Sequence, residues 1–219
     1  MEAPDRQSLR GVGFVPGVAI FALVLLLSSG GAVWLAQLPS VIESETNSVL
    51  AQLAVVVGGL VATISLVAWA APGFLRGSLL DGVRVSRLFV WCPLSIGAGA
   101  LFGYLGVNLG GAESSLGLSE GSGRLAWFAA VSMNLVLTPI FEELLFRGVL
   151  FSALRQRLSF LLAALLSALV FGVVHLASPA EGATLVGAAL WFAFVFESTE
   201  SLLPCVIGHA TMNWVYGLV

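Results

Sequence analysis

The chain contains no lysine and few charged residues of any kind. Of its 219 residues only 10% are charged, all nine basic residues are arginine, and the formal net charge is −3. Such a chain has no basic surface for nucleic acid. It is 58% hydrophobic with a mean hydropathy of +1.02, above the range of ordinary globular domains. The composition therefore predicts an integral membrane protein whose surroundings are the lipid bilayer, with no nucleic-acid partner.

Cysteine and histidine are equally scarce, with two of each. Cys92 and Cys205 both lie in apolar runs, and their spacing matches neither a disulfide framework nor a zinc motif. We interpret them as small buried residues.

Seven apolar segments approach or exceed the ~20 residues that a membrane-spanning helix needs. They cover residues 13–38, 49–71, 88–109, 125–154, 160–177, 183–196 and 202–219. This pattern predicts an all-α, polytopic transmembrane bundle of about seven helices, between six and eight, in a single domain over residues 1–219. The sixth segment is short for a span. The fourth is too long for one straight span, and Pro139 predicts a kink or break in it.

The start of the chain leaves one alternative open. The small residues at 28–32 could form the cleavage site of a signal peptide, but the apolar run continues past them and exceeds the usual ~7–15-residue core. A retained first helix is the better interpretation.

Arginine is distributed unevenly among the predicted loops. Seven arginines lie before the first segment, between the second and third, and between the fourth and fifth; the alternate loops hold only Arg124. The positive-inside rule then predicts a cytoplasmic amino terminus.

The stretch Pro139-Ile140-Phe141-Glu142-Glu143-Leu144-Leu145-Phe146-Arg147-Gly148 places three charges inside an apolar segment. Each such charge costs roughly 2.5–3.5 kcal/mol at the centre of a membrane helix on insertion scales. Glu143 and Arg147 are four residues apart, so a helix would pair them on one face. Glu142 lies about 100° further round, which leaves it without a local partner and makes it a candidate general base.

Both histidines also lie in apolar segments. His175 ends the stretch FGVVH, and His209 lies four residues before Asn213, so those two side chains share a helix face. If the helices joined near Arg157 are antiparallel, the depths of Glu142 and His175 in the membrane differ by only about 5 Å. We therefore expect Glu142 and His175 to meet in the membrane interior.

A carboxylate, two imidazoles and an amide can hydrolyse an amide bond by activating water and stabilising an oxyanion. No HExxH motif is present, but Glu142, His175 and His209 could alternatively bind Zn²⁺ with one open position. Each residue alone also has a plain structural interpretation, as an ion-pair or hydrogen-bond link between helices. Their joint occurrence favours catalysis.

The three motifs together resemble those of the CPBP family (CAAX protease and bacteriocin-processing, also called Abi) of intramembrane endopeptidases. The resemblance covers roughly residues 125–219, so the catalytic core is predicted in 124–219. The matching motifs, in order, are Glu142-Glu143-x-x-x-Arg147, Phe171-x-x-x-His175 and His209-x-x-x-Asn213.

The resemblance implies hydrolysis of a peptide bond inside the membrane. The membrane expected for this protein is a bacterial-type plasma membrane. The resemblance makes Glu142 the base, assisted by His175, and assigns His209 and Asn213 to the oxyanion. Glu143 and Arg147 would support the site. The family has been described both as zinc-dependent and as metal-free. We favour the metal-free form, with no cofactor, because Asn213 is a poor zinc ligand.

Two other classes of protein could use such residues. A proton- or ion-coupled transporter places carboxylates and histidines at mid-membrane, although it usually shows an internal repeat. A non-catalytic immunity or adaptor protein could keep the fold for binding alone, although here every motif is intact. The expected partner is a membrane-associated protein or peptide substrate, which could be a prenylated CAAX protein, a bacteriocin leader or a sorting-signal protein.

Overall fold

The computed structural model of the protein describes residues 12–42, 44–72, 74, 85–110, 123–175 and 178–217. Within these ranges every regular element is a helix, and five of the helices are long and apolar enough to cross a membrane. The predicted all-α polytopic bundle is confirmed, and the protein is an integral membrane protein.

The helices follow the predicted apolar segments. Their bounds are α1 Phe14–Leu35, α2 Pro39–Ile42, α3 Glu45–Ala70, α5 Val85–Gly110, α6 Arg124–Ser132, α7 Thr138–Glu143, α8 Ser152–Arg155, α9 Phe160–Val174, α10 Pro179–Thr199 and α11 Leu203–Gly217. The helices α6, α7 and α8 are parts of one continuous helix, joined by π-helical turns at Met133–Leu137 and Leu144–Phe151.

The predicted lengths of the last three helices are partly wrong. The sixth segment was expected to be short, but α10 has 21 residues because Ser178 caps its amino end and Pro179 begins it. The shorter helices are α9 and α11, with 15 residues each.

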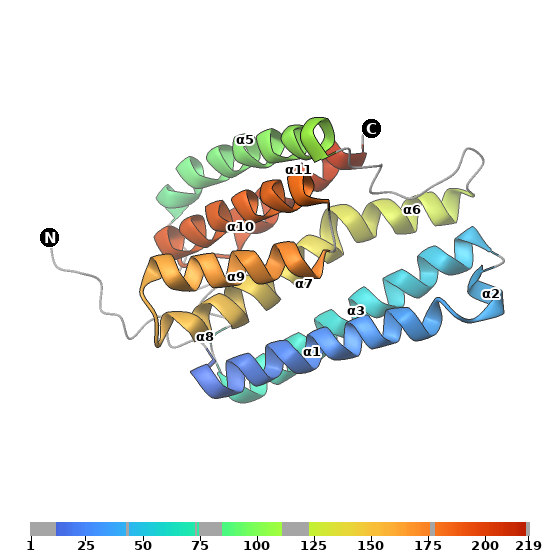
Figure 1. Cartoon of the computed structure of the whole chain (residues 1–219), viewed down its shortest axis with the longest axis horizontal. Coiled ribbons are helices and arrows are strands. Elements are labelled where there is room, and N and C mark those ends of the chain that lie inside the picture. Colours follow the sequence, from blue (N-terminus) through green and yellow to red (C-terminus); the bar gives the residue numbers. More distant parts are fainter. Residues whose placement is uncertain are drawn as a thin grey trace, which may run out of the picture.

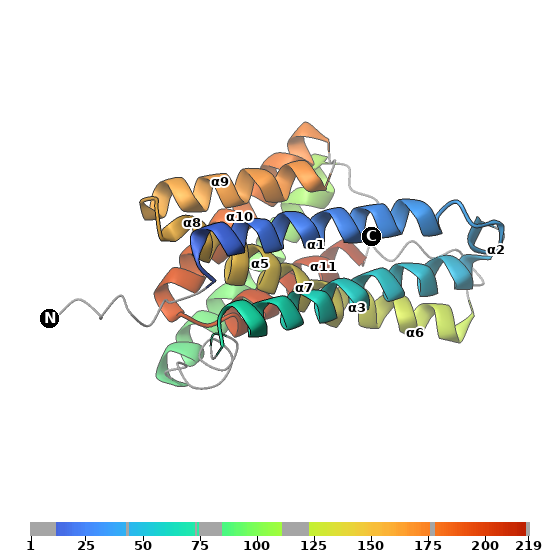
Figure 2. The same cartoon turned by 90° about the horizontal axis from the view of Figure 1, so that it is seen from below.

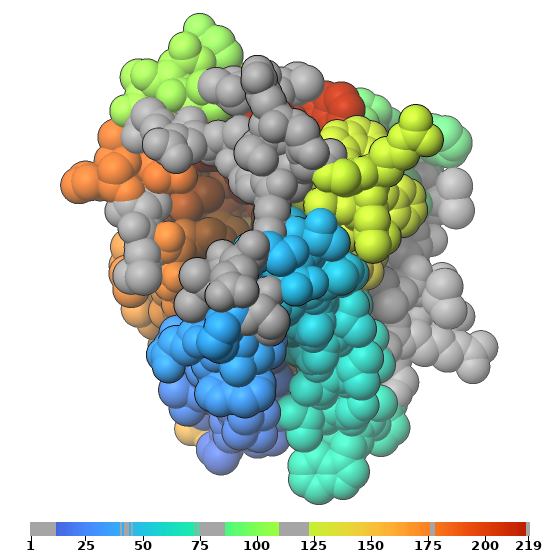
Figure 3. Space-filling model, turned by 90° about the vertical axis from the view of Figure 1, so that its right-hand side faces the viewer, coloured from blue at the N-terminus to red at the C-terminus, as the bar shows by residue number. Residues whose placement is uncertain are grey.

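The long helix 124–155 separates two groups of helices (Figure 1). The hairpin of α1 and α3 lies on one side, while α5, α10 and α11 lie on the other, with α9 beside α10. Figure 2 shows the hairpin from below, with the long helix behind it. In both views α1, α3 and α6 extend further toward one end of the molecule than α9 and α10 do. Figure 3 looks onto that end, where α1, α3 and α6 lie side by side.

Glycines bring α5 and α11 into close contact. A Cβ added at Gly99 would collide with the carbonyl oxygen of Gly208, and one at Gly103 would lie 2.9 Å from the carbonyl oxygen of Met212. Small residues of this kind let membrane helices approach backbone to backbone. Because His209 follows Gly208 directly, this contact fixes the depth and direction of that histidine.

Pro139 does not break the long helix. The helix instead widens just before the proline, where the N–H of Thr138 bonds the carbonyl of Met133, five residues back rather than four. A π-helical turn gives the proline ring room that a regular α-helical turn would deny it. Of the predicted kink or break, the break is therefore excluded, because the chain stays helical through Glu142 and Glu143.

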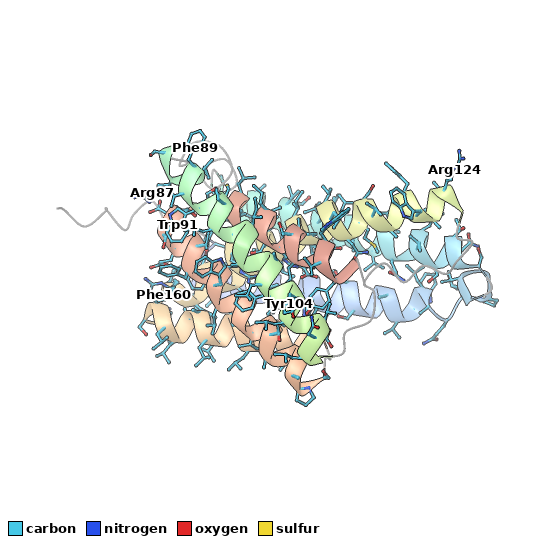
Figure 4. All side chains as sticks on the ribbon, turned by 90° about the horizontal axis from the view of Figure 1, so that it is seen from above. Arg87, Phe89, Trp91, Tyr104, Arg124 and Phe160 are labelled. Atoms are coloured by element: carbon cyan, nitrogen blue, oxygen red, sulfur yellow. The ribbon has the colours of Figure 1, made fainter. Side chains whose placement is uncertain are left out.

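Charged side chains outside the site lie at the two ends of the bundle. Figure 4 places Arg87 and Phe160 at one end and Arg124 at the other. At the first end Arg87 donates to the carbonyl of Ser198, at 2.8 Å, and Arg155 forms an ion pair with Glu197, at 2.7 Å. The other loop residues that carry the orientation prediction, at 1–11, 75–84 and 111–122, lie outside the described residues.

Candidate active site

The two adjacent glutamates lie in different environments, as their helical positions predict. Glu143 is fully buried and its Oε1 lies 3.1 Å from Nη1 of Arg147, one helical turn later. The predicted ion pair is therefore present. Glu142 points to a different side of the helix, and 17% of its side chain is exposed.

Two phenylalanine rings enclose the guanidinium of Arg147. Its Cζ atom lies 5.3 Å from the ring centre of Phe171 and 5.4 Å from that of Phe192, close enough for cation–π attraction from both. Its Nη2 also donates to the carbonyl of Ala189 at 3.3 Å. Arg147 therefore joins the long helix to α9 and α10, which sequence spacing alone did not indicate.

Glu143 also holds His209, a contact that the sequence did not predict. Its Oε1 accepts a hydrogen bond from Nδ1 of His209 at 2.8 Å. The imidazole stacks on Phe192, with the ring planes 13° apart. A carboxylate can only accept from this nitrogen, so Nδ1 carries the proton and Nε2 faces the opposite way.

His175 is oriented in the same manner by a different acceptor. Its Nδ1 donates to the carbonyl of Phe171, one helical turn earlier, at 2.7 Å. A carbonyl oxygen has no hydrogen to give, so the neutral ring must carry its proton on Nδ1. The lone pair of His175 is then on Nε2, facing Glu142.

The two histidines meet at Glu142. Oε2 of Glu142 lies 3.7 Å from Nε2 of His175 and 3.7 Å from Nε2 of His209, and it is buried without a hydrogen-bond partner in the protein. The expected meeting of Glu142 and His175 is confirmed. These separations are too long for a direct hydrogen bond.

The side chains of Glu142, His175 and His209 differ in how much of each is exposed. His175 is 31% exposed, whereas His209 is only 3% exposed. His175 lies at the carboxyl end of α9, which is the end bordered by the longer α1, α3 and α6. His175 is therefore the most exposed of the three side chains, and His209 is the most buried.

Asn213 shares a face of α11 with His209, as its spacing predicts, but its amide has a partner on the long helix. Nδ2 of Asn213 donates to the carbonyl of Asn134 at 2.9 Å. Asn134 was not among the predicted site residues, and no sequence signal other than the nearby Pro139 points to it.

The zinc alternative requires Glu142, His175 and His209 to act as ligands. Two imidazole nitrogens and a carboxylate are suitable donors for catalytic zinc. Among the described residues, however, no three histidine, cysteine, aspartate or glutamate side chains are arranged so that they could hold a metal ion. Independence from metal stays a prediction.

The fold and the site define a polytopic membrane protein with a carboxylate–imidazole centre between its helices. Residues 124–215 match the family model described as type II CAAX prenyl endopeptidase Rce1-like, and this range contains all the site residues above. That part of the chain is therefore similar to the Rce1-like CAAX prenyl endopeptidases, in agreement with the resemblance found in the motifs.

One curated relative supports the same assignment. The chain is 30% identical over 83 residues to "Putative membrane peptidase YdiL" of Bacillus subtilis (strain 168). The aligned part is 38% of this chain and 34% of that protein, so the chain spans about a third of the length of the relative it matches. No solved structure matches the chain.

Proposed function

We propose that the protein is an intramembrane endopeptidase that hydrolyses a peptide bond of a membrane-associated protein or peptide. The observation that carries the proposal is the position of Glu142, whose Oε2 lies 3.7 Å from Nε2 of both histidines. The family match over 124–215 supports the reaction class.

In the first step a water is held between Glu142 and His175. An oxygen at hydrogen-bond distance from both Oε2 of Glu142 and Nε2 of His175 fits their 3.7 Å separation. The water donates one hydrogen to each acceptor, so its own lone pair points toward the substrate carbonyl. Glu142 then takes a proton as the water oxygen attacks the carbonyl carbon.

The negative charge that develops on the substrate oxygen is stabilised by His209. In this mechanism His209 carries a proton on both nitrogens, and Nε2–H donates to the oxyanion. Its Nδ1–H is held by Glu143, which fixes the plane of the ring before the substrate arrives. When the tetrahedral intermediate collapses, Glu142 returns its proton to the departing amine nitrogen, and the enzyme is regenerated.

Glu143 and Arg147 serve this chemistry without touching the substrate. Both are buried, and the guanidinium compensates the charge of the carboxylate that orients His209. The charges that are costly in a membrane helix are therefore divided between a closed supporting pair and one accessible base.

The test of this proposal is cleavage of a peptide by purified protein in detergent, comparing wild type with Glu142→Gln. The amide cannot accept the water proton, so turnover should fall by at least 10²-fold while thermal stability stays near that of wild type. Glu197→Gln, which alters a carboxylate at the bundle edge, is the control and should keep cleavage. Unchanged turnover in Glu142→Gln would refute the assignment.

Candidate substrates for this assay are a prenylated CAAX peptide, a bacteriocin leader and a sorting-signal peptide, each presented in detergent or lipid. The family description names CAAX prenyl endopeptidases, so the prenylated peptide is the first substrate to try.

The proposed orientation has the amino terminus and the end with Arg87, Arg155 and Arg157 in the cytoplasm. Within the described residues, that end carries three arginines and the other end carries one, Arg124. Single cysteines at 124 and 157, in a chain with Cys92 replaced by serine, test this in intact cells. An impermeant thiol reagent should label Arg124→Cys only. Labelling of Arg157→Cys instead would show that the orientation is the opposite of the one proposed.

A further inference from the structure

Pro139 leaves one backbone carbonyl of the long helix without its regular partner. In the π-helical turn before it, the N–H of Thr138 bonds the carbonyl of Met133, five residues back. The next carbonyl in the same register is that of Asn134, and its partner would be the N–H of residue 139. Proline has no such hydrogen. An uncompensated carbonyl inside a membrane protein is costly.

The side chain of Asn213 supplies the missing hydrogen. Its Nδ2 donates to the carbonyl of Asn134 at 2.9 Å, from the helix that also carries His209. The bond joins α11 to the long helix at Asn134, before Pro139, whereas Glu142 lies after the proline on α7. It therefore lies between the two parts of the chain that must be aligned for catalysis.

We propose that Asn213 is a positioning residue, whose amide replaces the absent N–H of Pro139 and stabilises the π-helical turn. A π-helical turn contains one residue more than an α-helical turn, so its loss would rotate the following residues by about 100°. Such a rotation would move Glu142 away from His175 and His209. This role goes beyond the proposed peptidase function and differs from the oxyanion role expected from the sequence, because here the amide acts on the backbone.

A double-mutant cycle between Asn213→Ala and Pro139→Ala tests the proposal by thermal unfolding in detergent. Alanine at 139 restores an N–H, which can satisfy the nearby carbonyls without help from Asn213. We expect Asn213→Ala to lower Tm by about 2–8 °C in the wild-type chain and by less than about 1 °C in the Pro139→Ala chain. Equal losses in both chains would overturn the proposal. This measurement does not depend on the protein being a peptidase.

A second measurement keeps the test decisive if Pro139→Ala fails to fold. Hydrogen–deuterium exchange of the segment 133–143 should be faster in Asn213→Ala than in wild type, because the turn has lost its support. The matched control is Asn108→Ala, since Asn108 also donates to a backbone carbonyl, that of Tyr104 at 2.8 Å, but is exposed on α5. Exchange that is no faster in Asn213→Ala than in the control contradicts the role.

The rate of cleavage then separates positioning from direct oxyanion binding. A positioning role predicts that Asn213→Ala lowers kcat by at least 10-fold in the wild-type chain, and that the same change costs less than about 2-fold in the Pro139→Ala chain. A direct donor to the oxyanion would cost the same factor in both chains, because Pro139 does not contact the substrate. That outcome would return Asn213 to the oxyanion.

Discussion

Replacing Arg147 with methionine should destabilise the protein severely, and the reason is the charge it leaves behind. Methionine keeps much of the length of the side chain between Phe171 and Phe192, so packing changes little. Glu143, however, would remain fully buried without its cation. Removing one partner of a buried ion pair typically costs 3–5 kcal/mol, because the other charge is then uncompensated.

For a chain of about this size each kcal/mol lowers Tm by roughly 2–4 °C. Arg147→Met should therefore lower Tm by about 6–20 °C. Adding Glu143→Gln to Arg147→Met removes the uncompensated charge, while the amide oxygen can still accept from Nδ1 of His209. We expect the double variant to be more stable than Arg147→Met alone, although it has lost one more native residue.

Thermal unfolding of detergent-purified protein, followed by a dye or by circular dichroism, measures these differences. The matched control is Arg124→Met on the same long helix, because Arg124 is exposed at its amino end and should tolerate the change within about 0.5 kcal/mol. If Arg147→Met were no less stable than Arg124→Met, the buried pair would have no structural role. If Glu143→Gln failed to recover stability, packing rather than charge would explain the loss.

Two further results are expected. Cleavage should survive exhaustive chelation, and elemental analysis of active protein should find less than stoichiometric zinc; loss of activity that added zinc restores would make Glu142, His175 and His209 ligands. Gly99→Ala should lower stability by about 1–3 kcal/mol and reduce cleavage, since its methyl group meets the carbonyl oxygen of Gly208 next to His209. Gly97→Ala, with open space around it, should do neither, and equal effects of the two variants would contradict this.

The number and order of the long helices could be predicted because a bilayer restricts the choices. Backbone groups in lipid must be satisfied within the segment, so an apolar run of sufficient length is a helix. The ends of helices were less predictable, since they depend on local capping. At α10, Ser178 and Pro179 begin the helix several residues before the apolar run does. The widened turn before Pro139 was also missed, because either a break or a π-helical turn accommodates a proline.

The site was predictable where partners lie on one helix and harder where they lie on two. The spacing of Glu143 and Arg147 leads directly to their ion pair. The meeting of Glu142 with His175 followed from counting residues on each side of one turn. In contrast, the bond between His209 and Glu143 depends on how α11 packs against the long helix. The glycines that bring α11 against α5 carry no chemical signal of their own.

The division of work between Glu142 and Glu143 follows from which ring nitrogen each acceptor occupies. Glu143 and the carbonyl of Phe171 each accept from Nδ1–H of one histidine, so both Nε2 atoms face Oε2 of Glu142. The two glutamates differ by one position on the helix, so a shift of register by one residue could move Glu143 into the place of Glu142. The accessible position would then hold Glu143, and the buried ion pair would be lost. The π-helical turn that precedes the pair therefore helps to set which glutamate faces the histidines, and its Asn134 is bonded to Asn213.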